Sequence, residues 1–255
     1  MRLALRLLVL LPLALAGPLA GASEPTQNPE VVRITGLRAI PWKSYRALRA
    51  AMDAYAAHKG LAPDAVFKLG VVLPPGATLP PNFAMRVSTP DGKEYPITMN
   101  GKLFELPILP DGVLDADLVT NLKGTAVKIG IHMETPGVPI GMDRLGDLRL
   151  TCRIERAIDR VEDGLLARML RPDVCDTSKG AYWTYAHFGI PSSGAALVDT
   201  ARRQALERRT DAHGIRYRIP LYDTSCGDDT LVEYAYTKPL PAATSGRTLR
   251  FTLKD

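Results

Sequence analysis

Two stretches that lie 113 residues apart share one pattern: Gly101-Lys-Leu-Phe-Glu-Leu-Pro107 and Gly214-Ile-Arg-Tyr-Arg-Ile-Pro220. Each begins with glycine and continues with an aromatic residue, an aliphatic residue and a final proline. At the same offset, Asp115-Ala-Asp-Leu-Val119 matches Asp228-Asp-Thr-Leu-Val232. After a small insertion, Gly124-Thr-Ala-Val-Lys-Ile-Gly-Ile131 matches Gly246-Arg-Thr-Leu-Arg-Phe-Thr-Leu253. Three matched fragments in the same order predict two related halves.

The residues around these fragments predict short strands separated by Gly/Pro turns. In the first half, about seven alternating segments have the number and spacing of a β-sandwich. They are Phe67–Val71, Met85–Val87, Tyr95–Ile97, Phe104–Leu106, Leu118–Val119, Val127–Ile131 and Leu148–Ile154. In the second half, the alternation of Trp183, Tyr185 and His187 is the expected partner of Phe67–Val71. Two independent β-sandwiches with similar turn chemistry are the alternative to a repeat.

Two segments have helical periodicity. Trp42, Tyr45, Leu48, Met52 and Tyr55 recur at helical spacing before Gly60, which is a typical C-terminal cap. This apolar stripe favours packing onto a sheet over binding to a membrane surface. Residues 156–180 contain a second helical pattern that ends before Pro172, and it predicts a helical linker between the halves.

The unit glycine, two residues, aromatic, residue, aliphatic, proline resembles the carboxypeptidase regulatory-like and transthyretin-like β-sandwich domains. The stretch Arg144-Leu-Gly-Asp-Leu-Arg-Leu-Thr-Cys152 is similar to uncharacterised exported bacterial proteins, which implies no known activity. The resemblance implies a mainly β fold with two tandem Ig-like/transthyretin-like β-sandwich domains, to which the two helical patterns add an N-terminal helix and a helical linker. The expected division is a signal peptide (1–22), a strand and amphipathic helix (23–63), a first sandwich (64–155), the linker (156–180) and a second sandwich (181–255).

The first 22 residues have the features of a cleavable export signal. Arg2 and Arg6 precede a short apolar run, and Ala20-Gly-Ala22 supplies small residues for cleavage after Ala22. We therefore expect a periplasmic or secreted protein with no transmembrane segment after cleavage. Cleavage removes two arginines and lowers the net charge from +5 to +3. Because the remaining charges are interspersed, with Arg202-Arg203 and Arg208-Arg209 as the closest approach to a basic stripe, the sequence argues against nucleic-acid binding.

Three cysteines in an exported chain predict one disulfide and one free thiol. The alternation from Leu148 to Ile154 predicts that Cys152 faces inward on a strand, whereas Cys175 and Cys226 lie in turn-like surroundings. A Cys175–Cys226 bridge and a Cys152–Cys175 bridge are equally reasonable, because the distance between Cα atoms decides the pairing.

The sequence contains no catalytic motif. The four histidines include His132, which shares a strand face with Glu134, but no third ligand follows at a diagnostic spacing, so neither a metal site nor a cofactor is predicted. Acidic pairs at Asp115/Asp117 and Asp228-Asp229 stand at matched positions, which favours a turn-forming role.

These observations predict a non-catalytic binding or structural protein, whose partner is another envelope protein or a cell-wall component. Three aromatic residues near loops are the candidates for ligand binding: Trp183, Tyr182 and Tyr222. An envelope hydrolase with an unfamiliar site near His187, Asp199 or Asp228-Asp229 is the alternative, and a secreted inhibitor of another protein is a third hypothesis.

Overall fold

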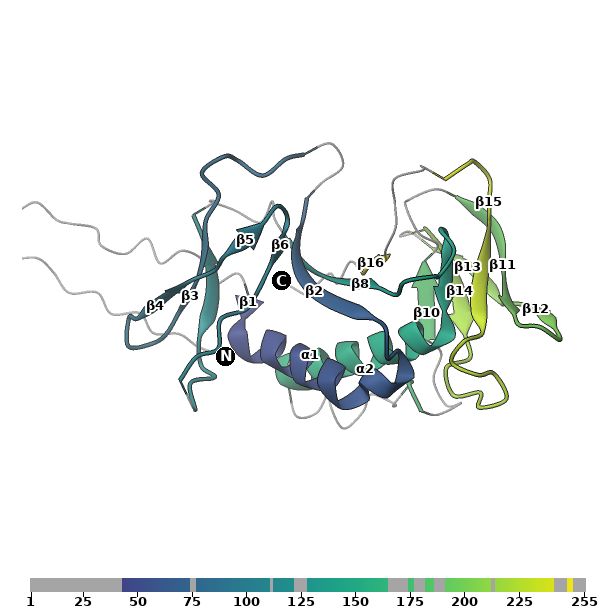
Figure 1. Cartoon of the computed structure of the whole chain (residues 1–255), viewed down its shortest axis with the longest axis horizontal. Helices are drawn as coiled ribbons and strands as arrows, with labels where there is room; N and C mark the ends of the chain where they lie inside the picture. Colours follow the sequence, from purple (N-terminus) through teal and green to yellow (C-terminus); the bar gives the residue numbers. More distant parts are fainter. Residues whose placement is uncertain are drawn as a thin grey trace, which may run out of the picture. The chain divides into compact units, whose positions relative to one another are not determined.

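The structure is a computed structural model, and it describes residues 43–73, 77–110, 112–121, 128–164, 174–176, 182–185, 191–211, 214–240 and 247–249. All of these belong to one structural unit, Leu37–Asp255. The predicted signal peptide, Trp42, His187 and His213 lie outside the described residues. The chain is mainly β, with four antiparallel sheets and two α-helices in its described part (Figure 1). Neither of these helices is long and apolar enough to cross a membrane.

Within the described residues, the two halves contain their α-helix and strands in the same order: a short strand, a helix and seven further strands. The first half has an additional 3-10 turn after its helix. The first half consists of β1 (Lys43–Ser44), α1 (Tyr45–His58), a 3-10 turn η1 (Lys59–Leu61), β2 (Val66–Val72), β3 (Met85–Ser88), β4 (Glu94–Pro96), β5 (Met99–Asn100), β6 (Leu103–Phe104), β7 (Asp117–Thr120) and β8 (Lys128–Glu134). The second half consists of β9 (Met142–Arg144), α2 (Leu145–Glu162), β10 (Tyr182–Tyr185), β11 (Ser192–Val198), β12 (Arg203–Ala205), β13 (Arg208–Asp211), β14 (Gly214–Ile219), β15 (Leu231–Tyr236) and β16 (Arg247–Leu249).

The strand pairing is also equivalent in the two halves. One sheet has the order β1-β7-β3-β4, and its counterpart has the order β9-β15-β11-β12. Lys43 pairs with Leu118 in the first, and Arg144 pairs with Leu231 in the second. Leu118 and Leu231 are the residues that the sequence match equates. The matched fragments therefore occupy equivalent strands.

The strand order is also equivalent in a second pair of sheets. The order β2-β6-β5 recurs as β10-β14-β13, and the pair Met99–Phe104 of one hairpin corresponds to the pair Arg208–Tyr217 of the other. Phe104 and Tyr217 are both buried and are the matched aromatic residues of the repeated unit. The halves differ at the end of the chain, because β16 pairs with β8 of the first half and extends its sheet to five strands.

The helix α2 contributes to two hydrophobic cores. Leu150, Ile154 and Ile158 follow one another at a spacing of four residues and pack in the core of the first half. Leu145, Leu148 and Cys152 lie on another face of the helix and pack in the core of the second half. Each fully buried leucine or isoleucine contributes about 1.5–3 kcal/mol, so this helix is a main connection between the two cores.

The prediction of a strand over Leu148–Ile154 is wrong, because these residues lie inside α2. The helix is buried on two faces, so its sequence lacks the single apolar stripe that identifies an amphipathic helix. Residues alternate locally between apolar and polar, and this short alternation has the period of a strand. The prediction that Cys152 faces inward is confirmed, since it is 1% exposed.

The backbone at the start of α2 requires a glycine. The N–H groups of Leu145 and Gly146 donate to the carbonyl oxygens of Thr230 and Asp228 at 2.8 and 2.9 Å. A Cβ atom on Gly146 would lie 2.1 Å from the carbonyl oxygen of Leu61. The loop before β15 therefore supplies acceptors for the first turn of the helix, which has no side-chain cap.

Candidate functional site

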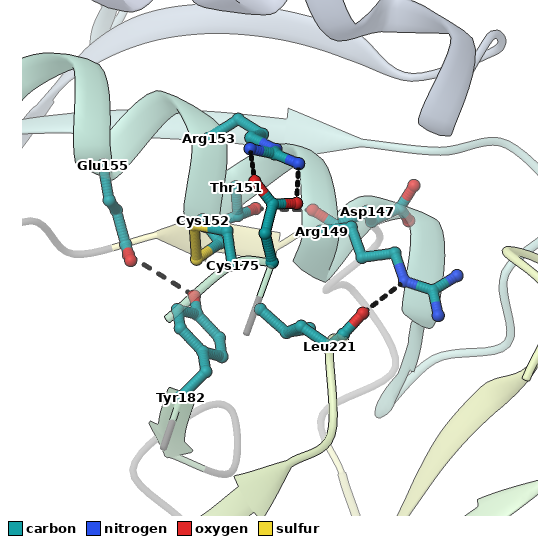
Figure 2. The surroundings of a disulfide bond; sticks show 10 residues. Asp147, Arg149, Thr151, Cys152, Arg153, Glu155, Cys175, Tyr182 and Leu221 are labelled. Atoms are coloured by element: carbon teal, nitrogen blue, oxygen red, sulfur yellow. Dashed lines mark hydrogen bonds and ion pairs between the residues drawn. A yellow bond between two sulfur atoms is a disulfide. The ribbon is translucent and has the colours of Figure 1, made fainter. Parts of the chain in front are cut away.

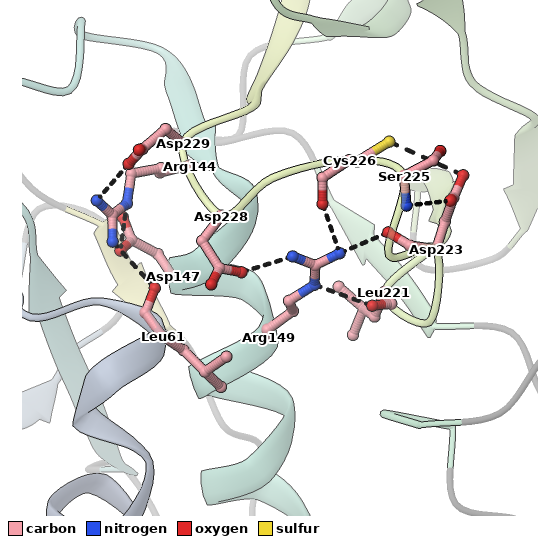
Figure 3. Close-up of polar contacts among 10 residues, drawn as sticks. All are labelled: Leu61, Arg144, Asp147, Arg149, Leu221, Asp223, Ser225, Cys226, Asp228 and Asp229. Atoms are coloured by element: carbon pink, nitrogen blue, oxygen red, sulfur yellow. Dashed lines mark hydrogen bonds and ion pairs between the residues drawn. The ribbon is translucent and has the colours of Figure 1, made fainter.

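Arg149 of α2 organises the loop that joins β14 to β15 (Figure 3). Its guanidinium donates to the carbonyl oxygens of three loop residues, Leu221 (2.9 Å), Asp223 (2.7 Å) and Cys226 (3.0 Å). It also donates to Oδ1 of Asp228 at 2.5 Å. The arginine side chain is 13% exposed, so these bonds form in a largely dry environment. The planar donor fork of arginine suits this arrangement of several acceptors.

Arg144 makes a second set of contacts beside the first. Its guanidinium donates to Oδ1 of Asp229 at 2.9 Å and to the carbonyl oxygen of Leu61 at 3.0 Å. Its Nε lies 3.6 Å from Oδ1 of Asp147. The adjacent carboxylates of Asp228 and Asp229 are thus held by two different arginines. This arrangement stabilises the junction of loop and helix and does not aim the two carboxylates at one reacting atom.

Cys226 is a buried thiol in the same loop. It is 1% exposed, and Nη2 of Arg202 lies 2.5 Å from its sulfur. The thiol also contacts Oδ2 of Asp223 at 3.8 Å. Hydrogen bonds from the side chain and backbone of Ser225 lower the pKa of Asp223 below its ordinary value. A cysteine with so little exposure behaves as part of the core and is not presented to a substrate.

The disulfide joins Cys152 of α2 to Cys175, with a Cα–Cα distance of 5.8 Å (Figure 2). This result decides between the two pairings that the sequence left open, and Cys226 is the free cysteine. Arg153, one residue after Cys152, forms an ion pair with Asp176, one residue after Cys175. The phenol of Tyr182 donates to Glu155 at 3.5 Å. The bridge is compatible with an oxidising, exported environment.

An outward-facing group of aromatic residues and an arginine lies on the sheet of β10, β14 and β13. We call Trp183, Tyr185 and Arg216 the aromatic face. The guanidinium carbon of Arg216 lies 5.9 Å from the ring centroid of Trp183 and 5.8 Å from that of Tyr185. Arg216 also forms an ion pair with Asp211. The opposite side of these strands carries Tyr182, Thr184, Tyr217 and Ile219, which are all buried.

The first half has no counterpart of the aromatic face. In the first half Leu69 pairs with Phe104, and in the second half Thr184 pairs with Tyr217. Because Phe104 and Tyr217 are the matched aromatic residues, Leu69 and Thr184 are at equivalent positions. Trp183, Tyr185 and Arg216 then correspond to Lys68, Gly70 and Leu103. A Cβ atom on Gly70 would lie 3.2 Å from Cδ2 of Leu103, so Leu103 covers the position that Tyr185 occupies in the second half. The aromatic face is therefore specific to the second half.

The predicted ligand-binding residues have different surroundings. Tyr182 is 8% exposed and belongs to the second core, Trp183 is half-buried in the aromatic face, and Tyr222 is 36% exposed in the loop before Cys226. The alternation of Trp183 and Tyr185 in the sequence predicts that they share one face of their strand, but it does not say which face is buried. In the structure the buried face carries Tyr182 and Thr184, and Trp183 and Tyr185 lie on the other face.

The structure does not bring the candidate metal-ligating residues His132 and Glu134 together with the candidate hydrolase residue Asp199 in one site. Nε2 of His132 lies 3.8 Å from Oε2 of Glu134 on β8. Asp199 accepts hydrogen bonds from the N–H groups of Ala201 and Arg202, and these bonds lower its pKa below the ordinary value. In the described part of the chain, no three His, Cys, Asp or Glu side chains are arranged to hold a metal ion.

Comparison with known proteins gives no relative: no family model, no curated protein and no solved structure matches this chain. The site must therefore be judged on its own geometry.

Sequence reasoning missed Arg149, Arg216 and Tyr185. The contacts of Arg149 span 72 to 79 residues, so no local pattern contains them. A signal for Arg216 did exist, because the repeated unit has arginine at this position where the first half has a leucine. Comparing outward-facing positions between the two matched fragments would have found it.

Proposed function

We propose that this protein is an exported, non-catalytic binding protein built from two related β-sandwich repeats. We further propose that it binds another protein of the cell envelope through the aromatic face of its second repeat. The equivalent order and pairing of strands in the two halves support a duplicated unit. The resemblance to transthyretin-like domains supports a sandwich architecture for each repeat.

The observation that carries this proposal is the arrangement of Arg216 beside both Trp183 and Tyr185. Tryptophan, tyrosine and arginine are the residues most enriched at the energetic centres of protein interfaces. Tyr185 is 42% exposed although its ring is large and apolar. Arg216 is held by two rings and by Asp211, so little side-chain freedom is lost when a partner binds. The first repeat has the same strands without this group, which argues that the fold does not require it.

The polar residues of the second repeat support a structural role for the loop before β15. Asp228 and Asp229 are among the residues near which the alternative, an envelope hydrolase, would have its site. Each is paired with a different arginine, and Arg149 uses its remaining donors on backbone carbonyls. These contacts fix the loop and the start of α2. They favour the binding protein over the hydrolase.

The test is capture of partners from crosslinked cell envelopes with the mature protein (residues 23–255), followed by quantitative mass spectrometry. We expect one dominant protein partner, and we expect Trp183→Ala to reduce its recovery at least about tenfold, since an interface centre contributes about 2 kcal/mol or more. Ile108→Ala is the matched control, because Ile108 is 83% exposed in the first repeat. Equal recovery with both variants, or turnover of ester, peptide or glycoside substrates by the mature protein, would overturn the proposal.

A further inference from the structure

The segment Arg203–Asp211 forms an edge of two sheets. β12 is the last strand of the order β12-β11-β15-β9, and β13 is the last strand of the order β10-β14-β13. Only Leu206 and Glu207 separate the two strands. One continuous extended segment therefore borders both sheets of the second repeat. We call it the β12–β13 edge.

The hydrogen-bond pattern shows which backbone groups of this edge point outward. In an antiparallel pair, residues alternate between those bonded to the neighbouring strand and those directed away from it. The N–H of Arg218 donates to the carbonyl oxygen of Glu207, and the N–H of Leu206 donates to that of Ala195. The alternation then directs the backbone groups of Arg208 and Thr210 away from β14, and those of Arg203 and Ala205 away from β11. Within the described residues, these four have no backbone partner on their outer side.

The edge carries excess positive charge. The hairpin of residues 207–218 contains four arginines against two carboxylates, a net charge of +2. Arg216 pairs with Asp211, and Arg218 pairs with Glu207 at 3.2 Å. Arg208 and Arg209 are exposed and form no ion pair with any described residue. Arg209 lies opposite Arg216, so it points to the same side of the sheet as the aromatic face.

Charged residues on an edge strand also serve to prevent sheets from aggregating. The first repeat shows how this chain protects the equivalent edge. There β4 contains three residues and ends at Pro96, and β5 contains two residues. The β12–β13 edge is longer and contains no proline. Arginine is its main protection, and arginine repels a second copy of the same edge while it attracts a strand of opposite charge.

We infer that the β12–β13 edge accepts an extended acidic segment of the partner protein as an additional β-strand. This inference rests on the proposed function, because the added strand would lie beside the aromatic face. Outward N–H and C=O groups of Arg208 and Thr210 would pair with the partner's backbone, as in other cases of strand addition. Acidic side chains on one face of the added strand would lie near Arg209, on the side of the aromatic face.

The experiment uses the mature protein and a labelled synthetic peptide of alternating glutamate and threonine, about eight residues long to match the edge. Fluorescence anisotropy measures its binding, and hydrogen exchange reports protection of the amides of Arg208 and Thr210. Thr210→Pro removes one outward N–H, and proline is tolerated where the N–H of an edge strand faces solvent. Thr210→Ala is the matched control because it keeps that N–H.

We expect the peptide to bind the wild type and Thr210→Ala equally, and to bind Thr210→Pro at least about tenfold more weakly, the effect of losing about 1.4 kcal/mol. A matching peptide of lysine and threonine should not bind. Equal binding to the proline and alanine variants would overturn strand addition. Heparin binding of similar strength that is insensitive to Thr210→Pro, without peptide binding, would instead show a general polyanion surface.

The two proposals fail in distinguishable ways. Loss of envelope capture in Trp183→Ala together with unchanged capture in Thr210→Pro would keep the proposed function and reject the added strand. If the wild type bound no peptide while the Arg208→Thr, Arg209→Thr double variant self-associated, the arginines would only protect the edge. Size-exclusion chromatography of that variant measures this outcome.

Discussion

Replacing Arg149 by alanine should be among the most destabilising changes of a charged residue in this protein. The variant loses four hydrogen bonds, three to backbone carbonyls and one to Asp228. A hydrogen bond to a charged group contributes about 1.5–3 kcal/mol, and such values do not add when the groups share one side chain. Removing one partner of a buried ion pair costs about 3–5 kcal/mol. Asp228 is 37% exposed and can be hydrated again, so we expect a loss of about 3 kcal/mol.

The assay is equilibrium unfolding of the mature protein in urea, followed by tryptophan fluorescence and far-UV circular dichroism. Asp228→Asn keeps the three carbonyl contacts and should lose only about 1 kcal/mol. Arg49→Ala is the control, because Arg49 forms one exposed ion pair with Asp53 on α1 and should lose about 0.3–0.5 kcal/mol. If Arg149→Ala were no more destabilising than Arg49→Ala, the hydrogen bonds of Arg149 would not be what stabilises the loop before β15.

Three further changes test other parts of the structure. Gly146→Ala should destabilise the protein by about 2–4 kcal/mol, whereas Gly164→Ala, which has open space around it, should change the free energy of unfolding by less than about 1 kcal/mol in urea titrations. Cys175→Ser opens a bridge that spans 23 residues and should cost about 3 kcal/mol, seen as a lower urea midpoint; an unchanged midpoint would contradict the assigned pairing. The lowered pKa of Asp223, caused first by the hydrogen bond from Ser225, contributes stability above pH 3.8 that is lost as the pH falls further. Thermal unfolding of Asp223→Asn should accordingly show a weaker loss of stability in acid than the wild type, and an identical acid profile would contradict this role.

The sequence predicted the elements that depend on short-range patterns. The stripe from Tyr45 to Tyr55 forms α1, and the alternating segments from Phe67 to Ile131 overlap strands of the first half. The matched glycines Gly101 and Gly214 both have positive φ, of 60° and 124°, which explains why this residue recurs at the hairpin turns. The limits of the domains stay predictions.

The site was less predictable than the fold. Tyr182 and Trp183 were grouped as candidates because both are aromatic residues near loops, but their neighbours in the chain could not show which one faces outward. The register of β10 against β14 decides this, since Trp183 lies opposite Arg218 and Tyr185 lies opposite Arg216. The cation–π contacts of Arg216 follow from that register and from no local motif.

The sequence alone determined that the chain is mainly β, that its two halves contain matching fragments, and that one cysteine remains unpaired. Each of these follows from composition, local periodicity or counting. The tertiary structure decided that Leu148–Ile154 is helical, that Cys152 pairs with Cys175, and that Arg149 fixes the loop before β15. Burial on two faces puts apolar residues on more than one side of α2, so that the short window Leu148–Ile154 alternates like a strand. A disulfide or an arginine contact depends on distances between residues far apart in the chain, which folding alone establishes.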